Sequence, residues 1–196
     1  AGTKRGGVPG SMSDEERRAD ASVRVLAAVP ADWARMRALR LRALGDAPDA
    51  FYVTLAEERE KPDAYWRERL EKPEVRTLCA ELRGEGGAWR DVGLAVVAPT
   101  SDDPSVAGLY SVWVAPDARG HGVGAALVAA AFEHAKAAGA RRVVLDVGVA
   151  NGPARRLYER AGFRATGRVF ALKPPRDHII ENELAIEVSS LRTPGA

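Results

Sequence analysis

The stretch "VWVAPDARGHGVGAALV", residues 112–128, decides the fold of this chain. It begins as a β-like run, passes through glycines at positions 120, 122 and 124, and ends in an apolar run. A strand, a glycine loop and a helix N-terminus in this order are typical of a phosphate-binding site. Apolar residues then recur every fourth position and predict a long helix that ends at Gly139: Val123, Leu127, Ala131 and Ala135.

Two common phosphate-binding loops can be compared with this stretch. Gly120, Gly122 and Ala125 satisfy the dinucleotide pattern G-x-G-x-x-A, and Asp146 ends the next strand, where a ribose-binding acid would lie. However, residues 116–119 separate the strand from the glycines, and an antiparallel meander precedes the unit. A Rossmann-like nucleotide-binding module is therefore kept only as an alternative. A triphosphate-binding loop does not fit, because no Gly-Lys-Ser/Thr follows the glycines.

Alternation, helical periodicity and turn residues predict the other elements outward from this stretch. We expect strands at 22–29, 75–82, 89–99, 106–116, 141–149, 163–171 and 182–188. We expect helices at about 30–44, 61–73, 120–139 and 151–162, and a loop with room for a short turn at 45–58. Short turns favour an antiparallel meander in the first half, whereas the strand–helix–strand unit at 106–149 should be parallel and right-handed.

Length and charge limit the classes of protein to consider. The 196 residues suffice for one domain, expected at 23–190, after a disordered lead or tag remnant at 1–22 and before a tail at 191–196. The net charge of +2, from 29 basic and 27 acidic side chains, gives no footprint for nucleic acid. A single cysteine, Cys79, fits a reducing compartment, and no stretch approaches a membrane span. These features predict a cytoplasmic location.

Two motifs together resemble the GNAT superfamily of N-acetyltransferases. Arg119, Gly122 and Gly124 match its acyl-CoA-binding motif, Arg/Gln-x-x-Gly-x-Gly/Ala. About thirty residues later, "NGPARRLYERAGF", residues 151–163, matches its second signature, Asn-x-x-Ala-x-x-Leu-Tyr-x-x-x-Gly-Phe. The resemblance covers residues 23–188. It implies an α/β fold with a mixed, mostly antiparallel sheet, a central parallel strand–helix–strand unit, and helices on both faces.

The resemblance implies an enzyme that moves an acetyl group from acetyl-CoA to a primary amine, by direct attack in a ternary complex. The acceptor, a small molecule or a protein amine, stays open, although "PPRDHII", residues 174–180, is expected to line its pocket. Strand 106–115 lacks the glutamate that many relatives use as a base. An acyl-CoA-binding sensor or degenerate relative without turnover is therefore an alternative. The resemblance also allows a homodimer, and no cluster has metal-ligand spacing.

The resemblance also assigns residues to the coenzyme. The pyrophosphate would bind amides at the helix N-terminus, and Arg119 would add a cation or brace the loop. The pantetheine arm would pair with the strand before the loop, and an amide near Val112 would polarise the thioester carbonyl. Alternation separates Tyr110, Val112 and Val114 from Leu109, Ser111 and Trp113, and we expect Trp113 in the core. The residues expected at the coenzyme are Val112, Trp113, Val114, Arg119, Gly120, His121, Gly122, Val123, Gly124, Ala125, Asn151, Ala154 and Tyr158.

Candidates for proton transfer come partly from the residues and partly from the resemblance. Asn151 is an expected N-cap, and the resemblance adds contacts of Asn151 and Ala154 with the pantetheine arm. Tyr158 shares a helix face with Ala154, which alone would indicate a buried aromatic; the resemblance makes it the general acid for the departing thiolate. Glu57 and Glu58, in the expected loop after the first helix, are candidate bases, as is a chain of water molecules.

Overall fold

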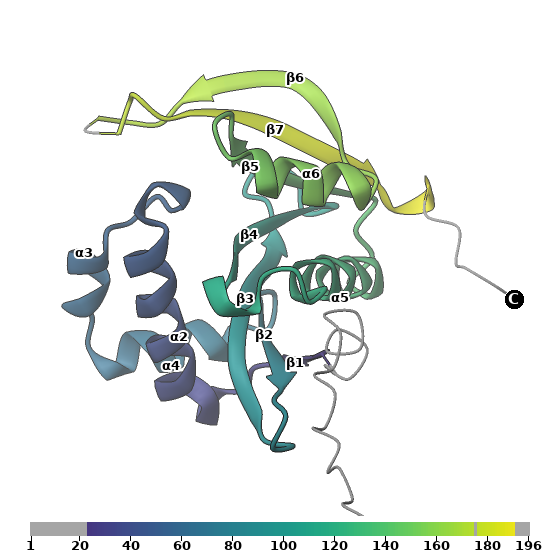
Figure 1. The fold of residues 1–196 in the computed structure, drawn as a ribbon. Coiled ribbons are helices and arrows are strands. Elements are labelled where there is room, and N and C mark those ends of the chain that lie inside the picture. Colours follow the sequence, from purple (N-terminus) through teal and green to yellow (C-terminus); the bar gives the residue numbers. More distant parts are fainter. Residues whose placement is uncertain (1–22, 175, 191–196) are drawn as a thin grey trace, which may run out of the picture.

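The computed structural model describes residues 23–174 and 176–190, so the expected lead and tail lie outside the described residues (Figure 1). The strands are β1 (Val23–Ala27), β2 (Arg76–Arg83), β3 (Trp89–Pro99), β4 (Val106–Val114), β5 (Arg142–Gly148), β6 (Arg164–Ala171) and β7 (Ile180–Glu187). The α-helices are α2 (Trp33–Asp46), α3 (Leu55–Arg59), α4 (Asp63–Glu71), α5 (Val123–Ala137) and α6 (Gly152–Arg160). Short 3-10 turns are η1 (Pro30–Asp32), η2 (Pro48–Ala50), η3 (Pro116–Ala118) and η4 (Val188–Ser190).

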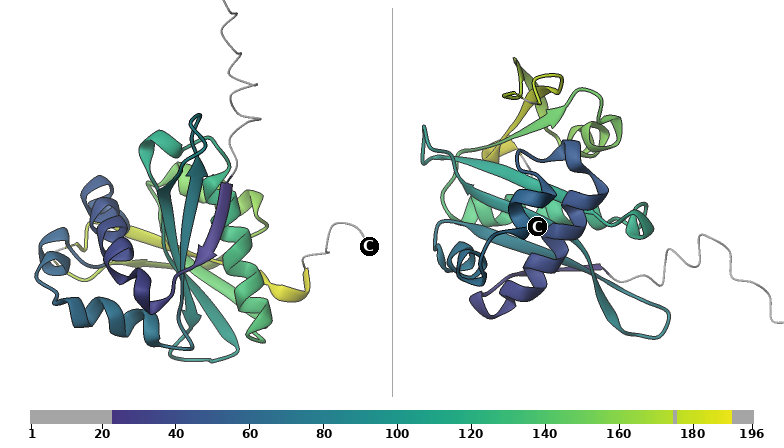
Figure 2. Two further views of the ribbon diagram at one scale, coloured as in Figure 1. Left: turned by 90° about the horizontal axis from the view of Figure 1, so that it is seen from below. Right: turned by 90° about the vertical axis from the view of Figure 1, so that its left-hand side faces the viewer.

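The strands form one sheet in the order β1-β2-β3-β4-β5-β7-β6. Every neighbouring pair is antiparallel except β4 and β5, which are parallel. Helices α2 and α4 cover one face, and α5 covers the other (Figure 2). The predicted mixed sheet with a central parallel unit is therefore confirmed. The Rossmann alternative is wrong, because a dinucleotide-binding sheet is mostly parallel.

The predicted ends of α5 and α6 agree with the backbone conformation. Gly139, just after α5, has a φ of +82°, and Gly162, just after α6, has a φ of +99°. Glycine adopts this left-handed conformation without the penalty that a Cβ brings. At the start of α6, Asn151 Oδ1 accepts a hydrogen bond from the amide of Ala154 at 3.2 Å, which confirms the predicted N-cap.

The segment 45–58 contains more helix than the predicted loop with a short turn. Helix α2 continues to Asp46, and a further helix, α3, occupies Leu55–Arg59. Thr54 and Glu57 form a capping box: the Thr54 hydroxyl accepts from the Glu57 amide, and the Glu57 carboxylate accepts from the Thr54 amide at 2.6 Å. This reciprocal pair satisfies donors at the start of α3 and stabilises the short helix. Glu58 therefore projects from a helix.

Strand β4 contains a β-bulge that breaks the predicted alternation. Trp113 lies opposite Leu94 and Tyr110 lies opposite Val96, so two residues of β4 face a single residue of β3 between those pairs. Ser111, within the bulge, has a φ of +57°, in the left-handed region. A bulge bends the strand and increases its twist. The predicted grouping of Leu109, Ser111 and Trp113 on one face is therefore wrong beyond Ser111.

Candidate functional site

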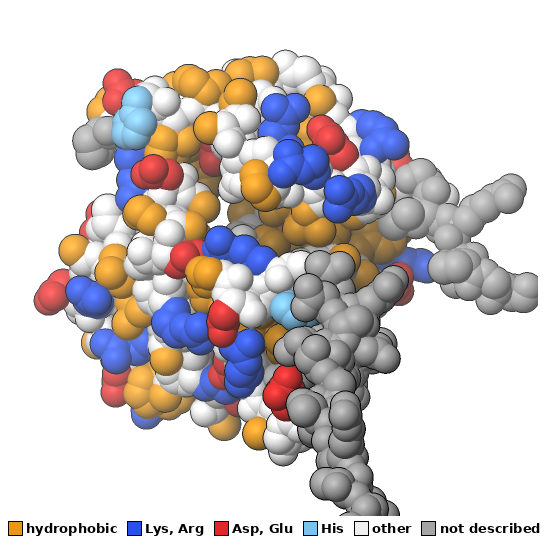
Figure 3. Space-filling model, viewed as in Figure 1, with side chains coloured by type: hydrophobic (Ala, Val, Ile, Leu, Met, Phe, Trp, Pro, Cys, Tyr) orange, Lys and Arg blue, Asp and Glu red, His pale blue; other side chains and the backbone are white. Residues whose placement is uncertain are grey.

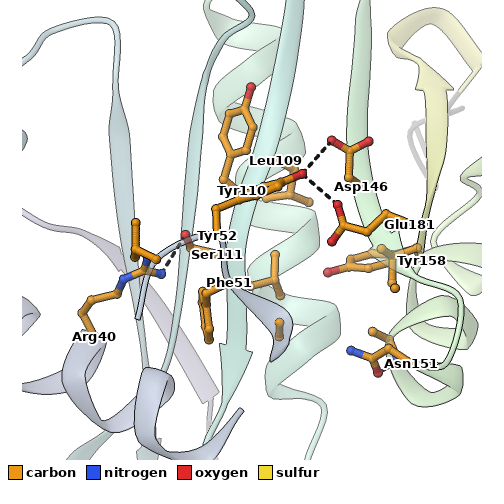
Figure 4. Close-up of a pocket in the computed structure, with 16 residues that line it drawn as sticks. Arg40, Phe51, Tyr52, Leu109, Tyr110, Ser111, Asp146, Asn151, Tyr158 and Glu181 are labelled. Carbon is orange, nitrogen blue, oxygen red and sulfur yellow. Dashed lines mark hydrogen bonds between the residues drawn. The ribbon is translucent and has the colours of Figure 1, made fainter. Parts of the chain in front are cut away.

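A cavity lies where β4 and β5 stop pairing. Their register runs from Val106–Arg142 to Gly108–Val144 and goes no further among the described residues. Residues 109–112 of β4 and 146–148 of β5 then form two walls of the cavity, and the loop 50–53 before α3 closes a third side (Figure 4). The separation leaves backbone groups of both strands without the partner that a continuous sheet would supply.

Tyr158 projects from α6 into this cavity, with its hydroxyl directed towards β4 (Figure 4). Its side chain is buried, and its ring packs edge-on against Phe163 with centroids 6.0 Å apart. Burial raises the pKa of the phenol above its ordinary value. Tyr158 is therefore a protonated hydroxyl at neutral pH, at the edge of a cavity.

The structure brings some predicted coenzyme residues to this cavity and leaves others outside it. Val112, Asn151, Ala154 and Tyr158 line it. Trp113 does not, because its indole is buried in the core, where Nε1 donates a hydrogen bond to Asp46 at 2.8 Å. The expectation that Trp113 belongs to the core is confirmed. Its contact with a coenzyme stays a prediction.

The glycine loop leads into α5 outside this cavity. Gly120 and Gly122 have φ values of +83° and +79°, and Gly122 is the N-cap of α5 without a capping side chain. The first amides of α5 are thus free of a side-chain cap, as in many anion sites. Gly124 also has a packing role: a Cβ there would lie 3.0 Å from Leu157 Cδ2, so this glycine allows α5 to approach α6 closely. Its contact with a coenzyme stays a prediction.

Arg119 braces the loop that precedes α5. Its Nε donates to the carbonyl of Val114 at 3.0 Å, and its guanidinium forms an ion pair with Asp46. His121 Nδ1 lies 3.1 Å from the carbonyl of Arg119. The bracing role considered for Arg119 in the sequence is therefore confirmed. A direct contact with phosphate stays a prediction for Arg119, as it does for His121, Val123 and Ala125.

The two predicted bases lie in different surroundings, and neither lines the cavity. Glu57 is exposed and caps α3. Glu58 is buried, 1% exposed, with Arg40 Nε at 3.8 Å, Arg69 Nη1 at 3.7 Å and the Tyr65 hydroxyl at 3.3 Å. Burial lowers the pKa of Arg40, while the charge of Glu58 opposes that effect. Glu58 thus belongs to an internal ion cluster, and a role as base stays a prediction for both glutamates.

Sequence reasoning missed a second group of acidic side chains, which does line the cavity. The Tyr52 hydroxyl donates to Glu181 Oε2 at 2.8 Å and lies 3.5 Å from Asp146 Oδ2 (Figure 4). Glu181 is 7% exposed, whereas Asp146 is more exposed. Partial burial, with the charges of Glu181 and Glu183, raises the pKa of Asp146. Burial and the bond to Glu181 likewise raise the pKa of Tyr52.

The segment 174–180 acts on the cavity indirectly. Arg176 donates to the carbonyl of Pro48 at 2.9 Å and to that of Phe51. These bonds hold the loop that carries Tyr52 against the connection between β6 and β7. The described residues of the segment therefore support a cavity wall and are not themselves among the lining residues.

The surface around α6 is basic. A hollow with hydrophobic side chains in its floor lies between α6 and α5, and Lys or Arg side chains gather along its rim (Figure 3). Within residues 23–174 and 176–190, no group of His, Cys, Asp or Glu could hold a metal ion. No described helix combines the length and the apolar character that a bilayer span needs. The cytoplasmic location and the homodimer stay predictions.

Comparison with known proteins gives consistent matches. The model of the acetyltransferase (GNAT) family matches residues 36–163. The mycothiol acetyltransferase of Cellulomonas flavigena is 33% identical over 146 residues, which cover 73% of this chain and 40% of that protein. The chain thus spans less than half of that curated relative, so the activity of the relative does not transfer with the match.

Two solved structures share the fold. A Desulfovibrio desulfuricans protein assigned to the GNAT family aligns with a TM-score of 0.63 and 24% identity, over 85% of this chain and 99% of that one. A Salmonella typhimurium protein assigned as an acetyltransferase, solved with its cofactor acetyl-CoA, aligns with a TM-score of 0.64 and 19% identity, over 89% and 99% of the two chains. At these identities the likeness concerns the fold alone.

Proposed function

Because this chain belongs to the GNAT family of acetyltransferases, we propose that it transfers the acetyl group of acetyl-CoA to a primary amine. The amine attacks the thioester directly, in a ternary complex. The observation that carries the proposal is the gap between β4 and β5 beyond Gly108 and Val144, with the Tyr158 hydroxyl beside it. If β4 and β5 stayed paired along their whole length, an extended acyl carrier would have no place between the two strands.

The unpaired strand edges suit the arm of coenzyme A. Pantetheine is an extended chain with two amide groups, so it can pair with strand backbone as an added strand does. Residues 109–112 and 146–148 border the gap and supply such backbone. An amide near Val112 would then donate to the thioester carbonyl, whose oxygen gains negative charge during attack. At the other end of the coenzyme, the uncapped N-terminus of α5 would bind the pyrophosphate.

Tyr158 is the proposed general acid. The departing group is a thiolate, which needs a proton, and a buried phenol keeps its proton at neutral pH until such an acceptor forms. Its side chain is held by burial and by the Phe163 ring, so its hydroxyl has a fixed position. Ala154, one turn earlier on α6, and Asn151, the N-cap of that helix, would contact the arm beside it.

Tyr158→Phe tests the proposal, with Tyr65→Phe, on α4 and outside the cavity, as the matched control. We expect Tyr158→Phe to lower kcat by roughly 100-fold or more, the usual contribution of general acid catalysis, and Tyr65→Phe to keep its rate. Both should bind acetyl-CoA. At a hundred times the dissociation constant, acetyl-CoA adds about 2.7 kcal/mol and raises Tm by roughly 5–10 °C.

Three other results would change the conclusion. A Tyr158→Phe variant with the full rate across pH would remove Tyr158 from the mechanism. A Tm that acetyl-CoA and CoA leave unchanged would overturn the transferase proposal itself. A clear shift with acetyl-CoA, but no transfer to any of a broad set of amines, would favour the alternative of an acyl-CoA-binding protein without turnover.

A further inference from the structure

Asp146 and Glu181, here called the acidic pair, have no cation of the described residues within ion-pair distance. Among the described residues, no Arg, Lys or His side chain forms an ion pair with either carboxylate; Arg168 pairs with Glu183 instead. Glu181 is more than nine-tenths buried, and of its two oxygens Oε2 accepts from Tyr52 while Oε1 has no donor among those residues. A buried carboxylate without a cation is costly, so its persistence points to a ligand that supplies the charge.

The register of β5 and β7 brings the two carboxylates of the acidic pair close together. Glu181 lies opposite Gly148, and Asp146 is two residues from Gly148 on β5, so both side chains lie on the same face of the sheet. In Figure 4 both carboxylates turn towards the Tyr52 hydroxyl, within the cavity that also holds Tyr158. A cation at the acidic pair would thus sit beside the place proposed for the thioester.

We infer, on the basis of the proposed acetyl transfer, that the acceptor is an aliphatic amine with a second positive charge, bound by Asp146 and Glu181. Two carboxylates face the acceptor, and one ammonium group cannot neutralise both during the reaction. The attacking nitrogen must be neutral, so its ammonium gives a proton to one carboxylate. The other carboxylate remains charged and buried, and a second ammonium on the acceptor keeps it paired throughout the reaction.

The acceptor ammonium gives one proton to Asp146, and the nitrogen lone pair forms a bond with the acetyl carbon. The carbon–sulfur bond breaks, its electron pair stays on sulfur, and the thiolate takes the Tyr158 proton. The new amide nitrogen returns a second proton to the tyrosinate, and Asp146 releases its proton to water. The raised pKa of Asp146 makes it a stronger proton acceptor than an ordinary aspartate.

Three acceptors of equal chain length test the inference: butylamine, 1,4-diaminobutane and 4-aminobutyrate. They differ only in whether the far end is neutral, positive or negative. With the full chain, saturating acetyl-CoA and pH 8, we expect kcat/KM per amino group to be about tenfold or more higher for 1,4-diaminobutane than for butylamine, and lowest for 4-aminobutyrate. Glu181→Gln should bring the ratio of the first two close to one.

Glu187→Gln is the matched control, because Glu187 lies at the far end of the same strand, is paired with Arg142, and does not line the cavity. It should keep the wild-type ratio. Equal kcat/KM for all three acceptors, or an unchanged ratio in Glu181→Gln, would overturn the inference, and the wild-type comparison decides even if that variant does not fold. No turnover of any of the three by a protein that binds acetyl-CoA would overturn this acceptor class alone. Failure to bind acetyl-CoA would instead overturn the proposed function.

Discussion

Glu58 and Glu181 are both buried glutamates near the same cavity, but their charges are balanced differently. Glu58, 1% exposed, lies between Arg40 and Arg69, so the protein itself supplies the opposite charge. Glu181, 7% exposed, lies near Asp146 and has no described cation within ion-pair distance. A carboxylate that is paired with arginines of the protein stabilises packing, whereas a carboxylate without such a partner beside a cavity can bind a cationic ligand. Burial alone does not separate these two roles.

Removal of the balanced charge should give the largest effect on folding. Glu58→Gln keeps the shape of the side chain but leaves Arg40, which is mostly buried, and Arg69 close together without an anion. We expect a loss of about 3 kcal/mol in the free energy of unfolding, at the low end for a broken buried pair because Arg69 is partly exposed. Thermal and denaturant unfolding measure it. The exposed neighbour Glu60→Gln is the control, with a change within about 0.5 kcal/mol. Equal stability of the two variants would show that the Glu58 cluster contributes nothing.

Removal of the unbalanced charges should leave folding stability intact and reduce activity. The double variant Asp146→Asn, Glu181→Gln relieves repulsion between like charges on neighbouring strands, so stability should stay the same or rise by up to about 1 kcal/mol. Acetyl transfer should nevertheless fall by roughly 100-fold, because the cavity loses both its proton acceptor and its cation site. Unfolding curves and initial rates on one preparation give both numbers. A destabilisation as large as that of Glu58→Gln would place the acidic pair among the packing groups.

A smaller effect concerns the pH dependence of the rate. Burial raises the pKa of Asp146, the charges of Glu181 and Glu183 raise it further, and Arg168 and the Tyr52 hydroxyl lower it. Tyr110 also lies close enough for its charge to interact with Asp146. The acidic limb of kcat/KM should follow this pKa, since a protonated Asp146 neither binds an ammonium nor takes its proton. Glu183→Gln removes one raising charge and frees Arg168, so the pKa of Asp146 should fall and the limb should move to lower pH. An acidic limb that stays in place, or moves to higher pH, would show that the protonation of Asp146 does not control the rate.

Local signals in the sequence predicted most of the fold. The strand 89–99 has the expected bounds, and the glycines after α5 and α6 end those helices as expected, because each signal depends on neighbours in the chain. The helix α3 was missed although its capping box, Thr54 with Glu57, is also a local signal. The bulge at Ser111 has no comparable signal, since it depends on how β4 pairs with β3.

The acidic pair was missed for a reason of topology. Asp146 and Glu181 are distant in sequence, and they meet because β7 pairs directly with β5, with β6 at the edge. The sequence predicts that the last two strands form a hairpin. It does not indicate whether β6 or β7 pairs with β5. Glu58, by contrast, was proposed as a base from its place in the expected loop after the first helix, and only its ion pairs indicate that its charge is already balanced.

The close contact of Gly124 with Leu157 relates the positions of the two helices that carry the site. The helix whose N-terminus is proposed for the pyrophosphate and the helix that carries Tyr158 touch at a point where a Cβ would lie 3.0 Å from a methyl group. In the proposed complex, this contact would help to set the span between the pyrophosphate and the thioester of the donor. In that proposed complex, a donor with a shorter or longer arm would reach Tyr158 out of register, so the site would select its acyl carrier by length.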